Sequence, residues 1–186
     1  MKAMYFKFIT LLALALLTGC TTIPYEKPQD QLNIQKDLSL KPEEIVTMTQ
    51  VNWCAYAYGE VTPCHPQEAL GVQTRTKLIL ASYDKPHYKT MVEVQASDVV
   101  CAHLQTPVDT APNLFLFTQD YAVQIWPVEP SFKPDIAKKK LIVETLLQPG
   151  KRTLVGTEKD YVRDTGRGRA GMTMTSIVNL VNPCSI

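Results

Sequence analysis

Two cysteine and histidine pairs are the residues of this chain best suited to chemistry. His65 directly follows Cys64, and Cys101 lies two positions before His103. Two thiolates and two imidazoles are the ligand set of a structural zinc site. Because residues i and i+2 of a strand share a face, Cys101 and His103 could also act as nucleophile and base, oriented by Asp98. The paired C-x2-4-C and H-x3-5-H spacing of zinc sites is missing, however, and both uses need reduced thiols.

The first twenty residues bear on whether these thiols stay reduced. Lys2 and Lys7 precede an apolar stretch over 8–17, which is about half of the roughly twenty residues that a spanning helix needs. A charged start, a short apolar core and small residues at its end are typical of a secretory signal peptide. We therefore expect residues 1–19 to be removed during export.

The end of this segment is more specific. Residues 17–20 read LTGC, which resembles the lipobox of bacterial lipoproteins. The resemblance is confined to the signal region, and it implies that Cys20 becomes the acylated N-terminus of the mature chain. Thr21 stands where an aspartate would imply retention in the inner membrane, so the resemblance implies a lipoprotein on the periplasmic face of the outer membrane. An ordinary signal peptide that ends beside a cysteine is the alternative.

Export predicts disulfides for the four remaining cysteines, because an even number of cysteines in an oxidising compartment usually pairs. Four cysteines allow three connectivities. We favour Cys54–Cys64, because the intervening AYAYGEVTP contains a glycine and a proline and can turn back on itself; Cys101–Cys184 follows by exclusion. This pairing leaves no thiol for zinc or for catalysis. We therefore predict no catalytic residue, no metal ion and no cofactor.

The rest of the chain divides into a leader and one domain. Residues 20–41 are polar and contain two prolines, so we predict a lipidated N-terminus and flexible tether there. The 167 residues left after cleavage fit one domain, which we place at 42–186. The Pro-Glu-Glu start at 42–44 favours a helix over 42–53, although 53–58 also alternates as a strand.

From residue 71 onward, the alternation of β-branched and aromatic residues is typical of strands. We predict three hairpins and a final strand, with ranges 72–83 and 88–95, 113–118 and 121–126, 141–147 and 152–155, and 172–181. A helix beginning at the lysines of 138–140 is the alternative for the third hairpin. The expected fold is mainly β, an antiparallel sandwich or small barrel with one or two short helices near the N-terminus and with disulfide bonds.

A basic segment near the C-terminus is a candidate for anion or partner contact. Residues 20–132 carry 7 basic and 13 acidic side chains, whereas 133–169 carry 10 basic and 5 acidic. Arg163, Arg167 and Arg169 lie among glycines in what we expect to be a mobile loop, where guanidinium groups could bind an anion. A solvated face is the simpler reading of these charges. The loop lacks phosphate-loop spacing, and the sequence lacks an RNA-binding signature, which argues against nucleic acid.

The aromatic residues Tyr56, Tyr58, Tyr121 and Trp126 could form a platform for a sugar or a peptide, although aromatic residues in strands more often belong to a core. The sequence thus favours a non-enzymatic lipoprotein that is held in the outer membrane by acyl chains on Cys20. As an assembly component it would bind other envelope or secretion-machinery proteins. The alternative is a ligand-binding lipoprotein or an immunity or inhibitor lipoprotein, and a peptidoglycan-acting enzyme ranks below both.

Overall fold

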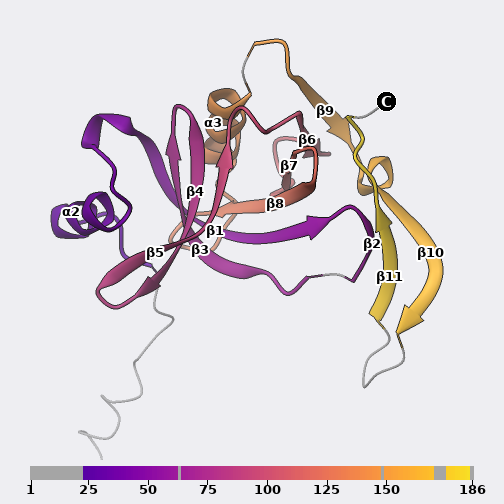
Figure 1. The fold of residues 1–186 in the computed structure, drawn as a ribbon, viewed down its shortest axis with the longest axis horizontal. Helices are drawn as coiled ribbons and strands as arrows, with labels where there is room; N and C mark the ends of the chain where they lie inside the picture. The colour runs from indigo at the N-terminus through magenta and orange to yellow at the C-terminus, as the bar shows by residue number, and fades with distance from the viewer. Residues whose placement is uncertain (1–22, 63, 148, 170–174, 185–186) are drawn as a thin grey trace, which may run out of the picture.

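The computed structural model describes residues 23–62, 64–147, 149–169 and 175–184, and this part of the chain is mainly β. Most of its strands form one large sheet in the order β5-β4-β3-β1-β8-β7-β6-β9 (Figure 1). The bounds of these strands are β1 Ile45–Ala57, β3 Gln67–Thr74, β4 Lys77–Asp84, β5 His87–Gln95, β6 Cys101–Gln105, β7 Leu114–Phe117, β8 Tyr121–Val128 and β9 Arg152–Gly156.

A smaller sheet and a few helices complete the described part. The small sheet has the order β10-β11-β2, with bounds β2 Gly59–Val61, β10 Val162–Arg169 and β11 Thr175–Leu180. The helices are α2 Pro28–Asp37, α3 Ile136–Leu146 and two 3-10 turns, η1 Pro42–Glu44 and η2 Glu158–Asp160. The predicted class, mainly β with antiparallel strands, short helices and disulfides, is confirmed. Neither α-helix in the described ranges combines the length and apolar character needed to cross a bilayer.

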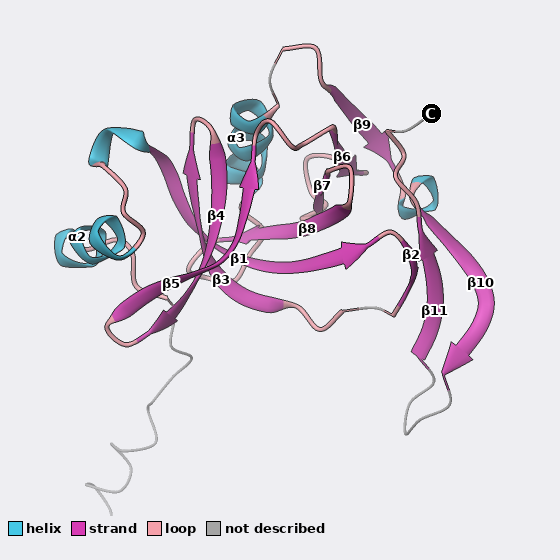
Figure 2. Cartoon of the chain, in the orientation of Figure 1, coloured by secondary structure: helices cyan, strands magenta, loops and turns pink. Residues whose placement is uncertain are grey.

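Period-two alternation gives the large sheet two apolar faces. Leu114 and Leu116 of β7 point to the face that α3 covers, where Ile142 and Leu146 of the helix are fully buried. The alternating residues of the same strands point to the opposite face. There α2 covers one end of the sheet and the small sheet covers the other end (Figure 2). The small sheet and α2 therefore lie at opposite ends of the molecule.

Two of the three predicted hairpins are confirmed. β4 and β5 pair antiparallel across the turn at 85–86, and β7 pairs antiparallel with β8. The strand predicted over 72–83 is instead two strands, because the chain turns between β3 and β4. The Thr74 hydroxyl makes this turn, accepting hydrogen bonds from the backbone N–H groups of Thr76 and Lys77 at 3.2 and 3.0 Å. A threonine can replace glycine or proline at a turn in this way.

The helix predicted over 42–53 is wrong. Only η1 is helical, and from Ile45 onward the chain forms β1, which pairs with β3 on one side and β8 on the other. Val51 and Trp53 are buried in this central position. Pairing on both edges and burial on alternate residues outweigh the helix-start signal of the Pro-Glu-Glu sequence, because propensity is a weak prior against tertiary contacts.

The third predicted hairpin is also wrong, and the alternative of a helix near 138–140 is what forms. Asp135 caps α3, since its carboxylate accepts a hydrogen bond from the Lys138 backbone N–H at 2.9 Å. The following strand β9 then pairs parallel with β6. A parallel neighbour requires a crossover connection, and a helix is the usual form of that connection. β9 is the edge strand of the large sheet, next to β6.

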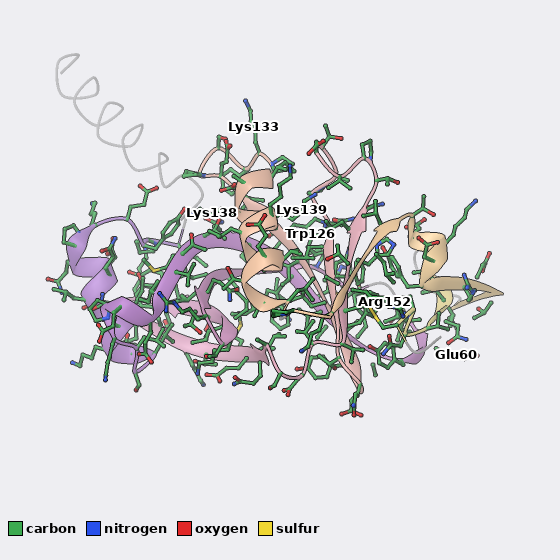
Figure 3. The ribbon with its side chains drawn as sticks, turned by 90° about the horizontal axis from the view of Figure 1, so that it is seen from above. Glu60, Trp126, Lys133, Lys138, Lys139 and Arg152 are labelled. Atoms are coloured by element: carbon green, nitrogen blue, oxygen red, sulfur yellow. A yellow bond between two sulfur atoms is a disulfide. The ribbon has the colours of Figure 1, made fainter. Side chains whose placement is uncertain are left out.

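Lys139 holds α3 to the loop before β7. The residue is fully buried, and its ammonium group donates hydrogen bonds to the backbone oxygens of Val108 at 2.6 Å and Ala111 at 2.5 Å. Figure 3 shows Lys138 and Lys139 on this helix. Burial lowers the pKa of the Lys139 amine below its usual range, and nearby Asp109 opposes that shift. The two carbonyl contacts satisfy an amine that is otherwise costly to bury.

The flexible tether predicted over 20–41 is wrong for its described part. Residues 28–37 form α2, and Ile34 on this helix is fully buried against the large sheet. The Asp37 carboxylate accepts a hydrogen bond from the Tyr88 backbone N–H at 2.9 Å, and the Tyr88 hydroxyl donates to the backbone oxygen of Pro24. Residues 23–41 thus belong to the folded domain that we predicted to begin at 42. Cys20 lies outside the described residues.

Candidate binding cleft

A cleft opens between the large sheet and the small sheet. Its volume is about 250 Å³. It draws its walls from β1, β7 and β8 of the large sheet, from the small sheet and from the turn η2. The lining residues are Tyr56, Val61, Asn113, Phe115, Gln124, Glu158, Tyr161, Val162, Val178 and Leu180. Most of these side chains are aromatic or aliphatic, so the cleft is a mainly apolar concavity with three polar side chains.

Three aromatic rings form the base of the cleft. The Phe115 ring lies 4.5 Å from the Tyr161 ring and 6.4 Å from the Tyr56 ring, measured between centroids. Distances in this range are favourable for aromatic pairs. Burial raises the pKa of the Tyr56 and Tyr161 hydroxyls above the usual value for tyrosine, so both rings stay neutral across physiological pH. The base of the cleft is therefore uncharged.

Two amide side chains supply hydrogen-bonding groups in the lining. Gln124 accepts a hydrogen bond from the Tyr56 hydroxyl at 3.1 Å, which orients both side chains. The Asn113 amide nitrogen donates to the Gln105 side chain. The Asn113 Oδ1 atom is buried and has no hydrogen-bond partner within the described residues. A buried acceptor without a partner is costly, so a donor on a bound molecule would be stabilised there.

A buried histidine and an aspartate support the cleft from behind. His103 of β6 is fully buried, and its Nε2 lies 3.0 Å from Oδ2 of Asp160 in η2. The same oxygen accepts a hydrogen bond from the Thr157 backbone N–H at 3.0 Å. The hydrogen bond to His103 is the largest cause that lowers the Asp160 pKa, and the Thr157 bond adds to it. The His103 ring contacts Tyr161 edge-on at 4.8 Å, so the pair positions a ring of the cleft.

Gly156 allows this histidine and aspartate to meet. A Cβ atom at this position would overlap the Asp160 carboxylate, and it would lie 3.4 Å from His103 Nε2. The predicted orienting partner, Asp98, does not contact His103 in the structure. Cys101 is bonded to another cysteine, so no thiol is left for a nucleophile and base pair. We assign the histidine and aspartate a positioning role.

Both predicted disulfides are confirmed. Cys54–Cys64 joins the end of β1 to the segment after β2, and Cys101–Cys184 joins β6 to the C-terminal segment after β11. The Cα atoms of each pair lie 6.1 Å apart. Each bridge links the large sheet to a segment adjoining the small sheet. The bridges therefore fix the two walls of the cleft relative to each other.

The basic segment is a strand and not a mobile loop. Arg163, Arg167 and Arg169 lie on β10, where their backbones pair with residues of β11. The Arg163 guanidinium donates a hydrogen bond to the backbone oxygen of Lys159. The side chains of Arg167 and Arg169 lie outside the described residues, so the proposed anion contact stays a prediction. A bulge between Asp164 and Arg167 interrupts this pairing locally.

Of the four residues in the candidate aromatic platform, Tyr56 alone is among the residues that line this cleft. Tyr56 lines the cleft, but the Tyr58 hydroxyl donates hydrogen bonds to the backbone oxygens of Thr118 and Tyr121, at 2.7 and 3.1 Å. Burial raises the pKa of Tyr58 to about 12, with a smaller contribution from nearby Asp120. The sequence reasoning missed Phe115 and Tyr161. The alternation in LFLF at 114–117 could have indicated Phe115, whereas nothing local indicates Tyr161.

Comparison with known proteins gives little further information. No protein-family model matches the chain, and no curated protein matches it. Two solved structures of Vav1 are similar over 65% of this chain and 33% of theirs, both at 12% identity. One is the apo structure of an activated truncation, with a TM-score of 0.43; the other holds an allosteric inhibitor, with a TM-score of 0.40. The chain thus spans about a third of the length of these structures, and a likeness at this level supports no inference about function.

Proposed function

We propose that this protein is an outer-membrane lipoprotein whose disulfide-bonded domain faces the periplasm and binds another envelope protein without catalysing a reaction. The observation that carries the proposal is the pairing of all four cysteines that follow Cys20. Structural disulfides form and persist in oxidising compartments, and they are rare in the cytosol. They agree with a chain whose start resembles a lipoprotein signal, in which Cys20 carries the acyl chains.

The cleft between the two sheets is the proposed partner site. Its volume of about 250 Å³ is below the range of about 300–1,000 Å³ usual for drug-sized ligands. An apolar cavity of about 150 Å³ holds a benzene ring. The cleft therefore suits one or two apolar side chains of a protein segment better than a whole small molecule. Buried aromatic anchors of this kind supply most of the binding energy in protein interfaces.

A charge at the cleft tests this proposal. Val162 lines the cleft and is partly buried, whereas Leu32 on α2 is 58% exposed at the opposite end of the molecule. We expect tagged, lipidated wild type and Leu32→Glu to recover the same envelope partner after crosslinking in cells. Val162→Glu should lose that partner while it still unfolds in one cooperative thermal transition, which shows that the domain is folded. Undiminished recovery by Val162→Glu, or no partner for the wild type, would contradict the proposal.

A ligand-binding lipoprotein is the second candidate, and the buried Asn113 Oδ1 favours it. If a small molecule supplies the missing donor, native mass spectrometry of gently purified protein should detect an adduct. Asn113→Ala should lose the adduct, because the variant removes the acceptor. A wild-type spectrum without any adduct would leave the protein partner as the better explanation.

A further inference from the structure

The described fold begins very close to the proposed anchor, and this limits how far the domain can stand from the membrane. Ile23 is buried at 8% exposure within an apolar cluster that includes Ile34 and Tyr88. Three residue steps separate Cys20 from Ile23, and an extended chain spans at most about 3.6 Å per residue. The leash is therefore no longer than about 11 Å. The surface around Ile23 must lie against the lipid headgroups if Cys20 is acylated.

An exposed hairpin loop borders the same surface. Residues 129–134, with the sequence EPSFKP, connect β8 to the start of α3. Pro130 in this loop lines one concavity together with Ile23 and Lys27. Figure 3 shows Lys133 projecting outward from the loop. The loop and the emergence point of the chain thus share one side of the molecule.

Phe132 at the tip of this loop is unusual in two ways. Its ring is 51% exposed, and its backbone has a φ of 61°, in the left-handed region that favours glycine or asparagine. The loop is closed by hydrogen bonds from Phe132 N–H to the Glu129 oxygen and from Glu129 N–H to the Lys133 oxygen, both at 2.8 Å. Glycine at this position would make the fold more stable, because glycine adopts a positive φ without strain. A bulky aromatic residue held in a strained position at an exposed tip points to a contact outside the chain.

We propose that the 129–134 loop rests on the lipid surface beside the anchor, with the Phe132 ring inserted among the headgroups. The apolar face of an interfacial helix is buried about 5–10 Å into the headgroup and acyl boundary. A leash of at most about 11 Å holds the loop close enough to the bilayer for Phe132 to reach a similar depth. The loop carries Glu129 and Lys133, so it suits a surface of mixed charge better than a strongly anionic one. This inference rests on the proposed lipidation of Cys20.

The contact would also orient the binding cleft. The small sheet that forms one wall of the cleft lies at the far end of the large sheet from α2 (Figure 1). Ile23 shares an apolar cluster with Ile34 of α2, so this end of the molecule would lie nearest the lipid and the small sheet would lie at the far end (Figure 1). The partner site would then be displaced from the lipid contact toward the periplasm.

Brominated lipids test this contact, because bromine on the acyl chains quenches tryptophan fluorescence only at short range. The lipidated protein is placed in phosphatidylethanolamine and phosphatidylglycerol vesicles, as wild type, Phe132→Trp and Val155→Trp. Val155 is the matched control because it is 58% exposed on β9, away from the emergence point. We expect quenching of the Phe132→Trp signal to exceed that of the control by about twofold or more, given insertion by about 5–10 Å.

Three outcomes would overturn the inference, and they separate it from the proposed function. If the protein sediments with the vesicles but Phe132→Trp is quenched no more than Val155→Trp, the lipid anchor stands and the loop contact is refuted. If the protein does not sediment with the vesicles, the anchor itself fails, and the loop contact fails with it. Phe132→Gly provides a second test, which holds even if Phe132→Trp misfolds. Phe132→Gly should fold with at least wild-type stability, and amine labelling of Lys133 in vesicles should become faster; unchanged labelling would also refute the contact.

Discussion

Removal of the Cys101–Cys184 bridge should cost more stability than removal of Cys54–Cys64. The bridged cysteines are 83 and 10 positions apart in sequence. With the loop-entropy relation, closing these loops stabilises the fold by about 4.5 and about 3 kcal/mol, respectively. The longer bridge therefore supplies a large share of the 5–15 kcal/mol that a domain typically has.

Urea unfolding of Cys101→Ala/Cys184→Ala and of Cys54→Ala/Cys64→Ala measures this difference. With a slope of about 2 kcal/mol/M, the midpoint should fall by about 2 M for the first variant and about 1.5 M for the second. Cys101 and Cys54 are both buried, at 1% and 3% exposure, so the lost packing is similar. Equal shifts, or a larger shift for the short loop, would refute the reasoning.

The same variant has a local consequence at the cleft. Val181 N–H donates a hydrogen bond to the Tyr161 backbone oxygen at 2.9 Å, immediately before the bridged C-terminal segment. Without the bridge to β6, this segment is held only by hydrogen bonds and packing. Amide exchange at Val181 should therefore be faster in Cys101→Ala/Cys184→Ala than in the wild type. Unchanged exchange would show that the bridge does not hold the small sheet in place.

Three further predictions concern Ile34, Asp160 and Lys139. Ile34→Ala should lower the free energy of unfolding by about 3 kcal/mol, while Leu32→Ala on the exposed side of the same helix should change it by less than about 0.5 kcal/mol; equal effects would mean that the helix is not docked. The fold lowers the pKa of the Asp160 carboxyl, chiefly through its hydrogen bond to His103. The ionised carboxylate therefore stabilises the folded state at pH values above the ordinary carboxyl pKa, and this stabilisation is lost as the pH falls through the lowered pKa. The melting temperature of Asp160→Asn should thus be below the wild type at pH 7 and approach it below about pH 4, where a constant difference would contradict the assignment. Lys139→Met should cost about 1–3 kcal/mol in chemical denaturation, since two carbonyl groups lose their donor; a neutral result would show that water replaces the amine.

Short-range features were predictable from the sequence. The hairpin at 84–88 and the turn between β7 and β8 are encoded by residues close together in the chain, and the Cys54–Cys64 pairing follows from a loop that can turn. Cys101–Cys184 was reached by exclusion, without any local signal. Compartment, through the LTGC motif, was the information that favoured disulfides over zinc.

The wrong helix and strand assignments share a cause. Residues 45–57 read as helix or strand depending on the window, and their place in the centre of the large sheet decides the outcome. Residues 136–146 contain β-branched residues that suggest a strand, but Asp135 supplies a cap and Ile142 a buried contact. A short stretch of sequence does not show whether either segment forms a helix or a strand, because the contacts that determine it come from distant strands.

The tether and the cleft escaped prediction for the same reason. The polar segment 28–37 has few apolar residues, yet Ile34 is buried against a sheet whose first strand begins at Ile45, eleven residues later. His103 and Asp160 meet across 57 positions, and the Tyr161 ring, at the end of η2, contacts the Phe115 ring at a tilted angle. Tyr56 was named from the sequence, but its neighbours in the cleft could be found only from the folded chain.

The intact mass of the protein from the membrane fraction tests the central claim most directly. The account predicts a chain that begins at Cys20, carries the mass of its acyl chains and is four hydrogens lighter than the reduced form because of the two disulfides. Cys20→Ala should remove the acyl mass and release the protein from the membrane fraction. An unacylated chain, a cleavage site elsewhere or free thiols at the four paired cysteines would contradict the account.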